Sequence, residues 1–324
     1  MRQRSEQGMA LLMVLLLVAM MSIIAVSVLD DIRFAVRRSH NSQANGQAQW
    51  YALGAETLAR ERIETLQRKD PQRTTLAGGW NGRPVELPLD GGLMQTTVTD
   101  GSACFNLNSV VAADQGEPFS RRELGVRQFT ALMEGLQIGQ ARQLAENLAD
   151  WMDSNDVTYA GAEDGAYLNG ERPYRTAGQP LAEVSELRTV QGFGPNVYAR
   201  LRPWVCALPT TDLSPININT LPADKALLLS ALTLGQADED LARGVLATRP
   251  ADGWRDPAGF WDRLLAGGGS VEAPIREQVR LDSRFFDMTA RVRWDDAEVV
   301  LNSRFERQAS GRLDLVARRW ALDD

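Results

Sequence analysis

The sequence predicts an α+β protein in which a long N-terminal helix begins in a membrane and continues onto an antiparallel sheet, with a large all-helical domain inserted. Three observations lead to this fold class. Residues 9–29 contain no charged side chain, residues 286–294 alternate between apolar and polar side chains, and the middle of the chain shows the apolar spacing of short helices. Alternation with a period of two is typical of a sheet with one covered face.

The apolar run Met9–Leu29 is long enough to cross a bilayer. As a helix it spans about 31 Å, close to the hydrocarbon thickness of a membrane. A cleavable secretory signal is the alternative, because residues 25–27 resemble a processing site, but such signals have apolar cores of only about 7 to 15 residues. Arg2 and Arg4 precede the run, so the positive-inside bias predicts a cytoplasmic N-terminus and an exported body.

The predicted helix continues beyond the membrane. Residues 31–68 contain no proline, and they have an apolar stripe at helical spacing that indicates packing on a soluble domain. The helix is expected to end before Asp70-Pro71, because proline cannot continue it. The stripe positions are Ala48, Tyr51, Ala52, Ala55, Leu58, Ala59, Arg62, Ile63 and Leu66.

Two groups of strands are expected, separated by most of the chain. Residues 71–92 are rich in proline and glycine, which is typical of loops. The C-terminal group forms an antiparallel meander with a turn at Ser310-Gly311. The predicted strands are 93–98 and 104–111, then 286–294, 299–305 and 313–320.

Between the two groups, residues 113–281 are predicted to be mostly helical and to interrupt a smaller helix-plus-sheet domain. The expected helices are 124–136, 138–152, 181–190, 195–201, 223–232 and 239–248.

Composition limits the classes of function. The chain has 324 residues with a formal net charge of −7, and an acidic exported body disfavours broad binding to phosphates. Its two cysteines, Cys104 and Cys206, permit one disulfide in an oxidising compartment. Two buried free thiols are the alternative.

A glycine directly before the apolar run distinguishes the start of this chain. The short polar leader ending at Gly8, followed by Met9 and an immediate apolar helix, resembles the leader of type IV prepilins. A dedicated peptidase cuts such leaders after the glycine and methylates the new terminus. Most pilins and pseudopilins carry glutamate at the fifth mature position, where this chain has Met13. A carboxylate in the bilayer needs a partner, so its absence points to the end of a filament.

Four further segments complete a resemblance that covers the entire chain. Together with the leader and Met13 they resemble the minor pseudopilin K family of type II secretion systems. The segments are Phe105–Asn108, Leu148–Asp153, Gly161–Asp164 and Ile216–Thr220.

The resemblance implies a pseudopilin fold with a large insertion, at the tip of a periplasmic pseudopilus that is anchored in the inner membrane. It would initiate or cap assembly and support protein export. The implied partners are minor pseudopilins I and J, with H as a further candidate, the prepilin peptidase, secreted substrates and the outer-membrane secretin. The expected domains are a leader at 1–8, a transmembrane part at 9–29, pseudopilin parts at 30–112 and 282–324, and at 113–281 an inserted helical domain with SAM-like or helix-hairpin-helix-like segments.

The densest group of polar residues follows the helix expected at 138–152. Its oxygen atoms suit calcium, which takes six to eight oxygen ligands. No histidine or cysteine lies nearby, which argues against zinc, and the spacing departs from an EF-hand. A solvated acidic loop is the alternative; resemblance to the K family, whose inserted domain binds calcium, favours the metal. The predicted ligands are Asp153, Asn155, Asp156, Glu163 and Asp164, with Asp150 and Asn169 close in sequence.

Two other functions fit parts of the sequence. Gly192–Pro195 and Ile216–Thr220 resemble helix-hairpin-helix modules, whose backbone amides contact nucleic-acid phosphates, so a membrane-anchored DNA receptor is the second hypothesis. An anchored metal-dependent hydrolase would use the acidic loop, but the only histidine, His40, lies far from it in sequence. Assembly is therefore expected, without catalysis and without a nucleic-acid partner.

Overall fold

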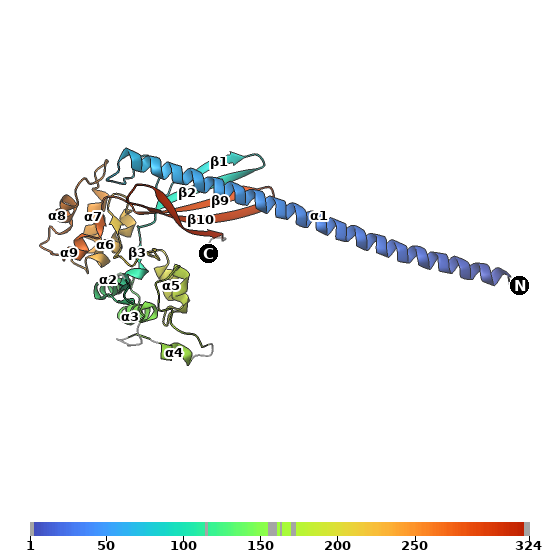
Figure 1. Cartoon of the computed structure of the whole chain (residues 1–324), viewed down its shortest axis with the longest axis horizontal. Helices are drawn as coiled ribbons and strands as arrows, with labels where there is room; N and C mark the ends of the chain where they lie inside the picture. The colour runs from blue at the N-terminus through green and yellow to red at the C-terminus, as the bar shows by residue number, and fades with distance from the viewer. Residues whose placement is uncertain (1–2, 114–115, 155–160, 163, 170–172, 321–324) are drawn as a thin grey trace.

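The computed structural model describes residues 3–113, 116–154, 161–162, 164–169 and 173–320, with side chains from Met9 onward. Figure 1 shows one long helix, α1 (Gln3–Lys69), whose first half projects alone and whose second half lies along a sheet. The other helices gather near the end of α1 that is farthest from the N-terminus, most of them to one side of that end. This is the α+β arrangement expected from the sequence, and α1 ends directly before Asp70-Pro71 as predicted.

The sheet has five antiparallel strands in the order β1-β2-β9-β10-β11. β2 and β9 are neighbours although the helical region separates them in sequence. Asp100, the last residue of β2, pairs with Phe286 near the start of β9, so the chain leaves the sheet and returns to it at one end. The strands are β1 Val85–Leu89, β2 Gly92–Asp100, β9 Phe285–Trp294, β10 Ala297–Arg307 and β11 Leu313–Trp320.

A stripe of small residues holds α1 against this sheet. Small side chains let the helix lie close to the strands, so that both apolar faces lose contact with water. The alternation predicted for residues 286–294 is confirmed, because every second side chain of β9 from Phe286 to Val292 is buried under the helix. Leu58 and Arg62 were assigned to the stripe by spacing, but Leu58 is 60% exposed and Arg62 is exposed as well. The buried helix positions are Ala44, Ala48, Ala52, Ala55, Ala59 and Ile63.

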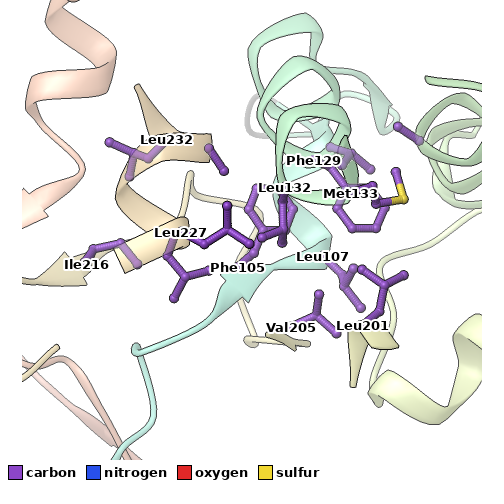
Figure 2. Close-up of a cluster of buried hydrophobic side chains, with 14 of the residues drawn as sticks. Phe105, Leu107, Phe129, Leu132, Met133, Leu201, Val205, Ile216, Leu227 and Leu232 are labelled. Carbon is purple, nitrogen blue, oxygen red and sulfur yellow. The ribbon is translucent and has the colours of Figure 1, made fainter. Parts of the chain in front are cut away.

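The helical region has an apolar core of its own. Figure 2 shows buried side chains from several of its elements gathered there, and the Phe129 ring stacks on Phe105 with centroids 5.2 Å apart. The Phe129 ring also stacks on Phe193, with centroids 6.3 Å apart. The helices are α2 Glu123–Gly135, α3 Ala141–Met152, α4 Asp164–Leu168, α5 Pro195–Leu201, α6 Ala226–Leu232, α7 Glu239–Ala247, α8 Pro257–Leu264 and α9 Ala273–Arg276.

Short strands and 3-10 helices connect these helices. β3 (Phe105–Asn106) pairs in parallel with β6 (Val205–Cys206), and β7 (Ile216–Asn217) pairs in parallel with β8 (Val279–Arg280). The antiparallel pair is β4 (Val111–Ala112) with β5 (Ser120–Arg121), and the 3-10 helices are η1 Leu107–Val110, η2 Val184–Thr189 and η3 Ala223–Lys225.

Each half of the helical region contains one asparagine motif, Asn106–Asn108 in the first half and Asn217–Asn219 in the second. The two motifs make the same set of hydrogen bonds. Asn106 and Asn217 each accept a hydrogen bond from the backbone N–H two residues later, at 3.2 and 2.9 Å. The second asparagine of each motif then bonds both the N–H and the carbonyl of one distant residue. Asn108 does so with Leu181, and Asn219 does so with Trp254. Buried amides paired in this way hold their loops rigidly.

A buried carboxylate joins the sheet to the helical region. Asp100 accepts hydrogen bonds from the backbone N–H of Ser102 at 2.8 Å, from Ser283 Oγ at 2.6 Å, and from the Thr220 hydroxyl. Burial raises the pKa of Asp100, and these hydrogen bonds only partly offset that rise. The three donors come from the chain leaving β2, the chain entering β9, and the second asparagine motif.

Three predicted elements are corrected. The strand expected at 104–111 is broken into β3, η1 and β4, because the Asn106 side chain turns the backbone at Asn108. The helix expected at 181–190 is the shorter 3-10 helix η2, whose start is held by Glu186. β1 lies within the segment expected to be loop; it is an edge strand, where Pro88 is tolerated.

Cys104 and Cys206 are joined by a disulfide, with their Cα atoms 5.8 Å apart and a sequence separation of 102. A loop of this length stabilises the folded chain by about 4–5 kcal/mol in the chain-entropy treatment. Cys206 packs on Phe285, the first residue of β9. The disulfide therefore reinforces the point at which the helical region meets the sheet.

We expect Glu56→Gln to loosen α1 from the sheet. Glu56 accepts hydrogen bonds from Arg318 at 2.6 and 2.9 Å and from Ser303 at 2.7 Å. Burial raises the pKa of Glu56, but the hydrogen bonds from Arg318 and Ser303 and the charge of Arg318 together lower it below its usual value. The substitution should cost about 1.5–3 kcal/mol at pH 7, the range for hydrogen bonds to a charged group.

This difference should shrink as the pH falls below about 4.5, because the stabilising carboxylate becomes protonated in both states. Denaturant unfolding of the full chain in detergent at pH 7 and at acidic pH measures it. Glu298→Gln, which removes an exposed pair with Arg291 in the same sheet, is the matched control and should change the free energy of unfolding by less than about 1 kcal/mol. An equal effect of the two substitutions would contradict the assignment.

Candidate functional site

The N-terminal half of α1 exposes apolar side chains along its whole length. A stretch of 18 residues within it has a mean hydropathy of 2.9, and α1 is the one helix among the described residues that is long and apolar enough to cross a membrane. This fits a single-pass anchor. Met13 lies within it and is 66% exposed, and Gly8 lies in the same helix. Cleavage after Gly8 stays a prediction.

The C-terminal half of α3 brings three carboxylates to one side of the helix. Glu146, Asp150 and Asp153 follow one another at spacings of four and three residues, and all three are at most 2% exposed. Arg121, from β5, pairs with Glu146 at 2.6 and 2.8 Å. The backbone N–H of Gly161 donates to Asp150 Oδ2 at 3.0 Å. The cluster is thus buried under the returning loop.

The electrostatics of this cluster are unfavourable for the anionic form of Asp150. Burial, and then the nearby charges of Asp153 and Glu146, raise the pKa of Asp150 to about 6, although the Gly161 hydrogen bond acts in the opposite direction. Asp150 Oδ1 is buried and accepts no hydrogen bond from the residues that the structure describes. The helix also ends here, and the carbonyl end of a helix adds partial negative charge. A cation would relieve these repulsions.

The loop after α3 contacts the rest of the helical region at two described residues, Gly161 and Asp164. A Cβ at Gly161 would lie 2.6 Å from Asp150 Oδ2 and from the Glu146 carbonyl, so only glycine fits there. Asp164, at the start of α4, accepts from the backbone N–H and the hydroxyl of Thr176 at 2.8 and 2.9 Å, and pairs with Arg175 at 3.1 Å. These contacts lower the pKa of Asp164, with the Thr176 backbone hydrogen bond as the largest cause.

Three aromatic rings connect the loop to α3. Trp151 contacts Tyr167 edge-on with centroids 5.1 Å apart, and Tyr174 lies 6.0 Å from Trp151 and 5.3 Å from Tyr167. Tyr167 comes from α4 and Tyr174 from the segment after it. Such pairs add about 0.5–1.5 kcal/mol beyond their buried area, so they hold the far side of the loop against the acidic end of α3.

The predicted ligands divide into two groups. Asp153 and Asp164 lie at the two ends of the loop, while Asn155, Asp156 and Glu163 lie outside the described residues. The described side chains alone form no complete metal site. Their donors are carboxylate oxygens, and one of these, Asp150 Oδ1, is buried without a partner among the described residues. This donor set suits calcium better than zinc. Calcium stays a prediction.

Sequence reasoning missed Glu146 and did not choose Asp150 as a ligand. The signal was available, because three acidic residues at helical spacing share one face of a helix. Acidic residues at helical spacing are common on solvated faces, however, and only the structure shows that these three are buried.

In the segment Gly192–Pro195, which suggested nucleic-acid binding, Phe193 is buried, while Gly192, Gly194 and Pro195 are exposed. Phe193 is buried on Phe129, and a Cβ at Gly192 would lie 2.5 Å from Leu144 Cδ2. Arg200, on the following helix, donates to the Leu136 carbonyl. These contacts give the segment a structural role.

His40 is on α1, and its Nε2 lies 3.3 Å from Asp295 Oδ2 in the β9–β10 turn. Both side chains are more than two-fifths exposed. The contact joins the helix to the end of the sheet and lies on a different element from the acidic loop.

Comparison with known proteins gives one consistent result. Family models described as "Type II secretion system (T2SS), protein K" match residues 103–210 and 216–282. Type II secretion system protein K of Klebsiella pneumoniae is 37% identical over 321 residues, 98% of this chain and 97% of its own. The Aeromonas hydrophila protein of that name is 33% identical over 323 residues, 97% of each chain.

A solved structure agrees with these relatives. One chain in the crystal structure of the GspK–GspI–GspJ complex from the enterotoxigenic Escherichia coli type 2 secretion system matches with a TM-score of 0.76 and 32% identity, over 88% of this chain and 100% of that chain. The predicted family is thus confirmed: the chain belongs to the protein K family of type II secretion systems, which are minor pseudopilins.

Proposed function

We propose that this chain initiates or caps the pseudopilus of a type II secretion system and so supports protein export across the outer membrane. Met9–Leu29 holds it in the inner membrane, with the N-terminus in the cytoplasm and the sheet and helical region in the periplasm. The prepilin peptidase cuts after Gly8. Subunits I and J, with H as a further candidate, are its neighbours, and secreted substrates and the secretin are contacts for its exposed body.

The place of the helical region is the observation that carries this proposal. It lies near the end of α1 that is farthest from the N-terminus, mostly to one side of that end (Figure 1), and Arg73, just after α1, donates to the Asp252 carbonyl there at 3.3 Å. In a filament whose helices run along its axis, material at that end fills the space of the next subunit. A terminal subunit has no next subunit to accommodate.

Met13 supports the same position. A carboxylate at this depth in the membrane would require a partner to neutralise it, and a shaft subunit has one in its neighbour. A subunit with methionine here can occupy the end of the filament, where the partner is missing.

The acidic end of α3 supports calcium as a bound ion. Asp150 and Asp153 are buried close together and repel each other, and a cation between them would remove that repulsion. Asp153 would hold the ion together with Asn155, Asp156, Glu163 and Asp164 from the loop, and Asp150 Oδ1 is a further donor. When bound, calcium would cross-link the loop to the end of α3.

The full chain is expected to form a stable complex with subunits I and J of its own secretion system. One chain of the GspK–GspI–GspJ complex matches most of this fold, which motivates the choice of partners. Co-expression in membranes, extraction in mild detergent and size-exclusion chromatography should give co-elution of all three. An unrelated single-pass protein extracted alongside is the control. Separate elution of three folded chains would contradict the assembly role.

Processing after Gly8 should depend on the glycine. Gly8→Leu should abolish cleavage by the prepilin peptidase, because the large side chain replaces the small residue at the cut, whereas the neighbouring Gln7→Ala should be cleaved normally. Intact mass measurement of chains purified with and without the peptidase checks this. A wild-type chain that keeps residues 1–8 in the presence of the peptidase would refute it.

Calcium is expected to raise the melting temperature of the full chain in detergent, because an ion that binds only the folded state stabilises it by about 2.7 kcal/mol at a hundred times its dissociation constant. Asp153→Asn should abolish most of the shift. The matched control is Asp240→Asn, an exposed aspartate on α7, which should keep it. An unchanged wild-type melting temperature between chelator and excess calcium would remove calcium from the proposal.

A further inference from the structure

A cleft lies where the sheet meets the helical region, and it is here called the junction cleft. Its walls come from the segment between β6 and β7, from α9 and β8, from the chain that enters β9 and from the chain that leaves β10. Its volume is about 630 Å³, within the range of about 300–1,000 Å³ that is typical of ligand sites. Leu213, Pro215, Pro274 and Ala309 give it apolar walls.

Four arginines line the junction cleft, and two of them are already neutralised. Arg284 pairs with Asp212 at 3.0 Å, and Arg307 pairs with Asp282 at 2.8 Å. These two pairs bring no net charge to the cleft. They also occupy both aspartates, so neither aspartate can neutralise another arginine without leaving its own.

The other two arginines, Arg122 and Arg280, form no ion pair with the described residues. Arg122 is half-buried and donates to the Thr211 carbonyl, which carries no full charge. Burial lowers the pKa of Arg122, although the charge of Asp212 acts in the opposite direction. The remaining acidic residue of the cleft is Glu277, which is exposed. Two arginines against one glutamate leave a positive charge here, in a chain whose net charge is −7.

A buried amide beside these charges is incompletely hydrogen-bonded. Gln278 lines the cleft and is 4% exposed. Its Nε2 donates to the Pro274 carbonyl at a long distance of 3.4 Å, and its Oε1 has no hydrogen-bond partner within the part of the chain that the structure describes. A buried acceptor without a donor destabilises a fold. Because the terminal torsion of glutamine is broad, the amide can turn to accept from an N–H group that enters the cleft.

We propose that the junction cleft binds an acidic peptide segment of a second protein. Carboxylates of the segment pair with the guanidinium groups of Arg122 and Arg280, whose planar N–H groups match the geometry of a carboxylate. A backbone N–H of the segment donates to Gln278 Oε1, and the apolar walls cover its carbon atoms. A peptide supplies both the anion and the N–H donor, whereas a small inorganic anion supplies no N–H group and a metal cation is repelled by the arginines.

The test measures binding of a fluorescent heptapeptide of alternating glutamate and alanine to the full chain in detergent, by fluorescence anisotropy. The same peptide with glutamine in place of glutamate is the matched probe. The glutamate peptide should bind, less tightly as salt is added, and the glutamine peptide should bind about tenfold more weakly or less. Equal binding of the two peptides would contradict the proposal. Full displacement of the glutamate peptide by an equal concentration of inorganic phosphate would assign the cleft to small anions instead.

Two substitutions locate the binding site. Arg122→Gln and Arg280→Gln each remove one guanidinium that has no ion pair in the monomer, and each should weaken binding of the glutamate peptide about fivefold or more. Arg255→Gln is the matched control, because Arg255 also belongs to the helical region and is 78% exposed, but does not line the cleft. It should leave the affinity unchanged.

Glu277→Gln separates the cleft from a general effect on folding. It removes the opposing charge at an exposed position, so it should tighten binding of the glutamate peptide about two- to threefold with an unchanged melting temperature. Damage to the fold cannot produce this combination. If the wild-type chain binds the peptide and the Arg122→Gln and Arg280→Gln variants bind it equally well, the cleft proposal is wrong. If the wild-type chain does not bind it, the cleft proposal is also wrong, and the complex with subunits I and J still tests the proposed function separately.

Discussion

The architecture depends on one buried carboxylate at the end of the sheet. Asp100 accepts hydrogen bonds from the segment that leaves β2, from Ser283 just before β9, and from Thr220 of the second asparagine motif. The segment that enters the helical region, the segment that leaves it, and Thr220 within it therefore all bind the same carboxylate. Because its two ends are pinned together, the region can be large without separating β2 from β9. The Cys104–Cys206 disulfide adds a covalent constraint beside the same junction.

The two halves of the helical region are fixed alike but differ in one respect. Asn108 and Asn219 make the same paired contacts, with Leu181 and Trp254. In the second half the chain passes from α7 to Trp254 through a short turn, whereas in the first half it passes from α3 to Leu181 through the acidic loop. The candidate calcium site is thus an addition to a scaffold that is complete without it. Its carboxylates are the part of that scaffold that a cation would stabilise most.

Sequence patterns correctly predicted the parts of this fold that local periodicity determines. β9 alternates because one face lies under α1, and α1 has a small-residue stripe because it lies on that face. The segment at Asn106 and Asn108 looked like a strand because its turn is made by the Asn106 side chain and held by contacts of Asn108 with Leu181 and Leu208, far along the chain. The same limit applies to the acidic site. Glu146 and Asp150 have helical spacing in the sequence, but their burial depends on a loop folding back over them.

α1 passes through three environments, and its sequence changes with each. Met9–Leu29 is apolar on every side, which suits lipid or other apolar helices. The sheet-bound half is apolar on the inner side through its alanines, as a helix packed on one surface requires. Its outer side should then be charged, yet residues 41–55 carry no charge and present two glycines and a tryptophan. The monomer accounts for the first two patterns and leaves the third without a partner.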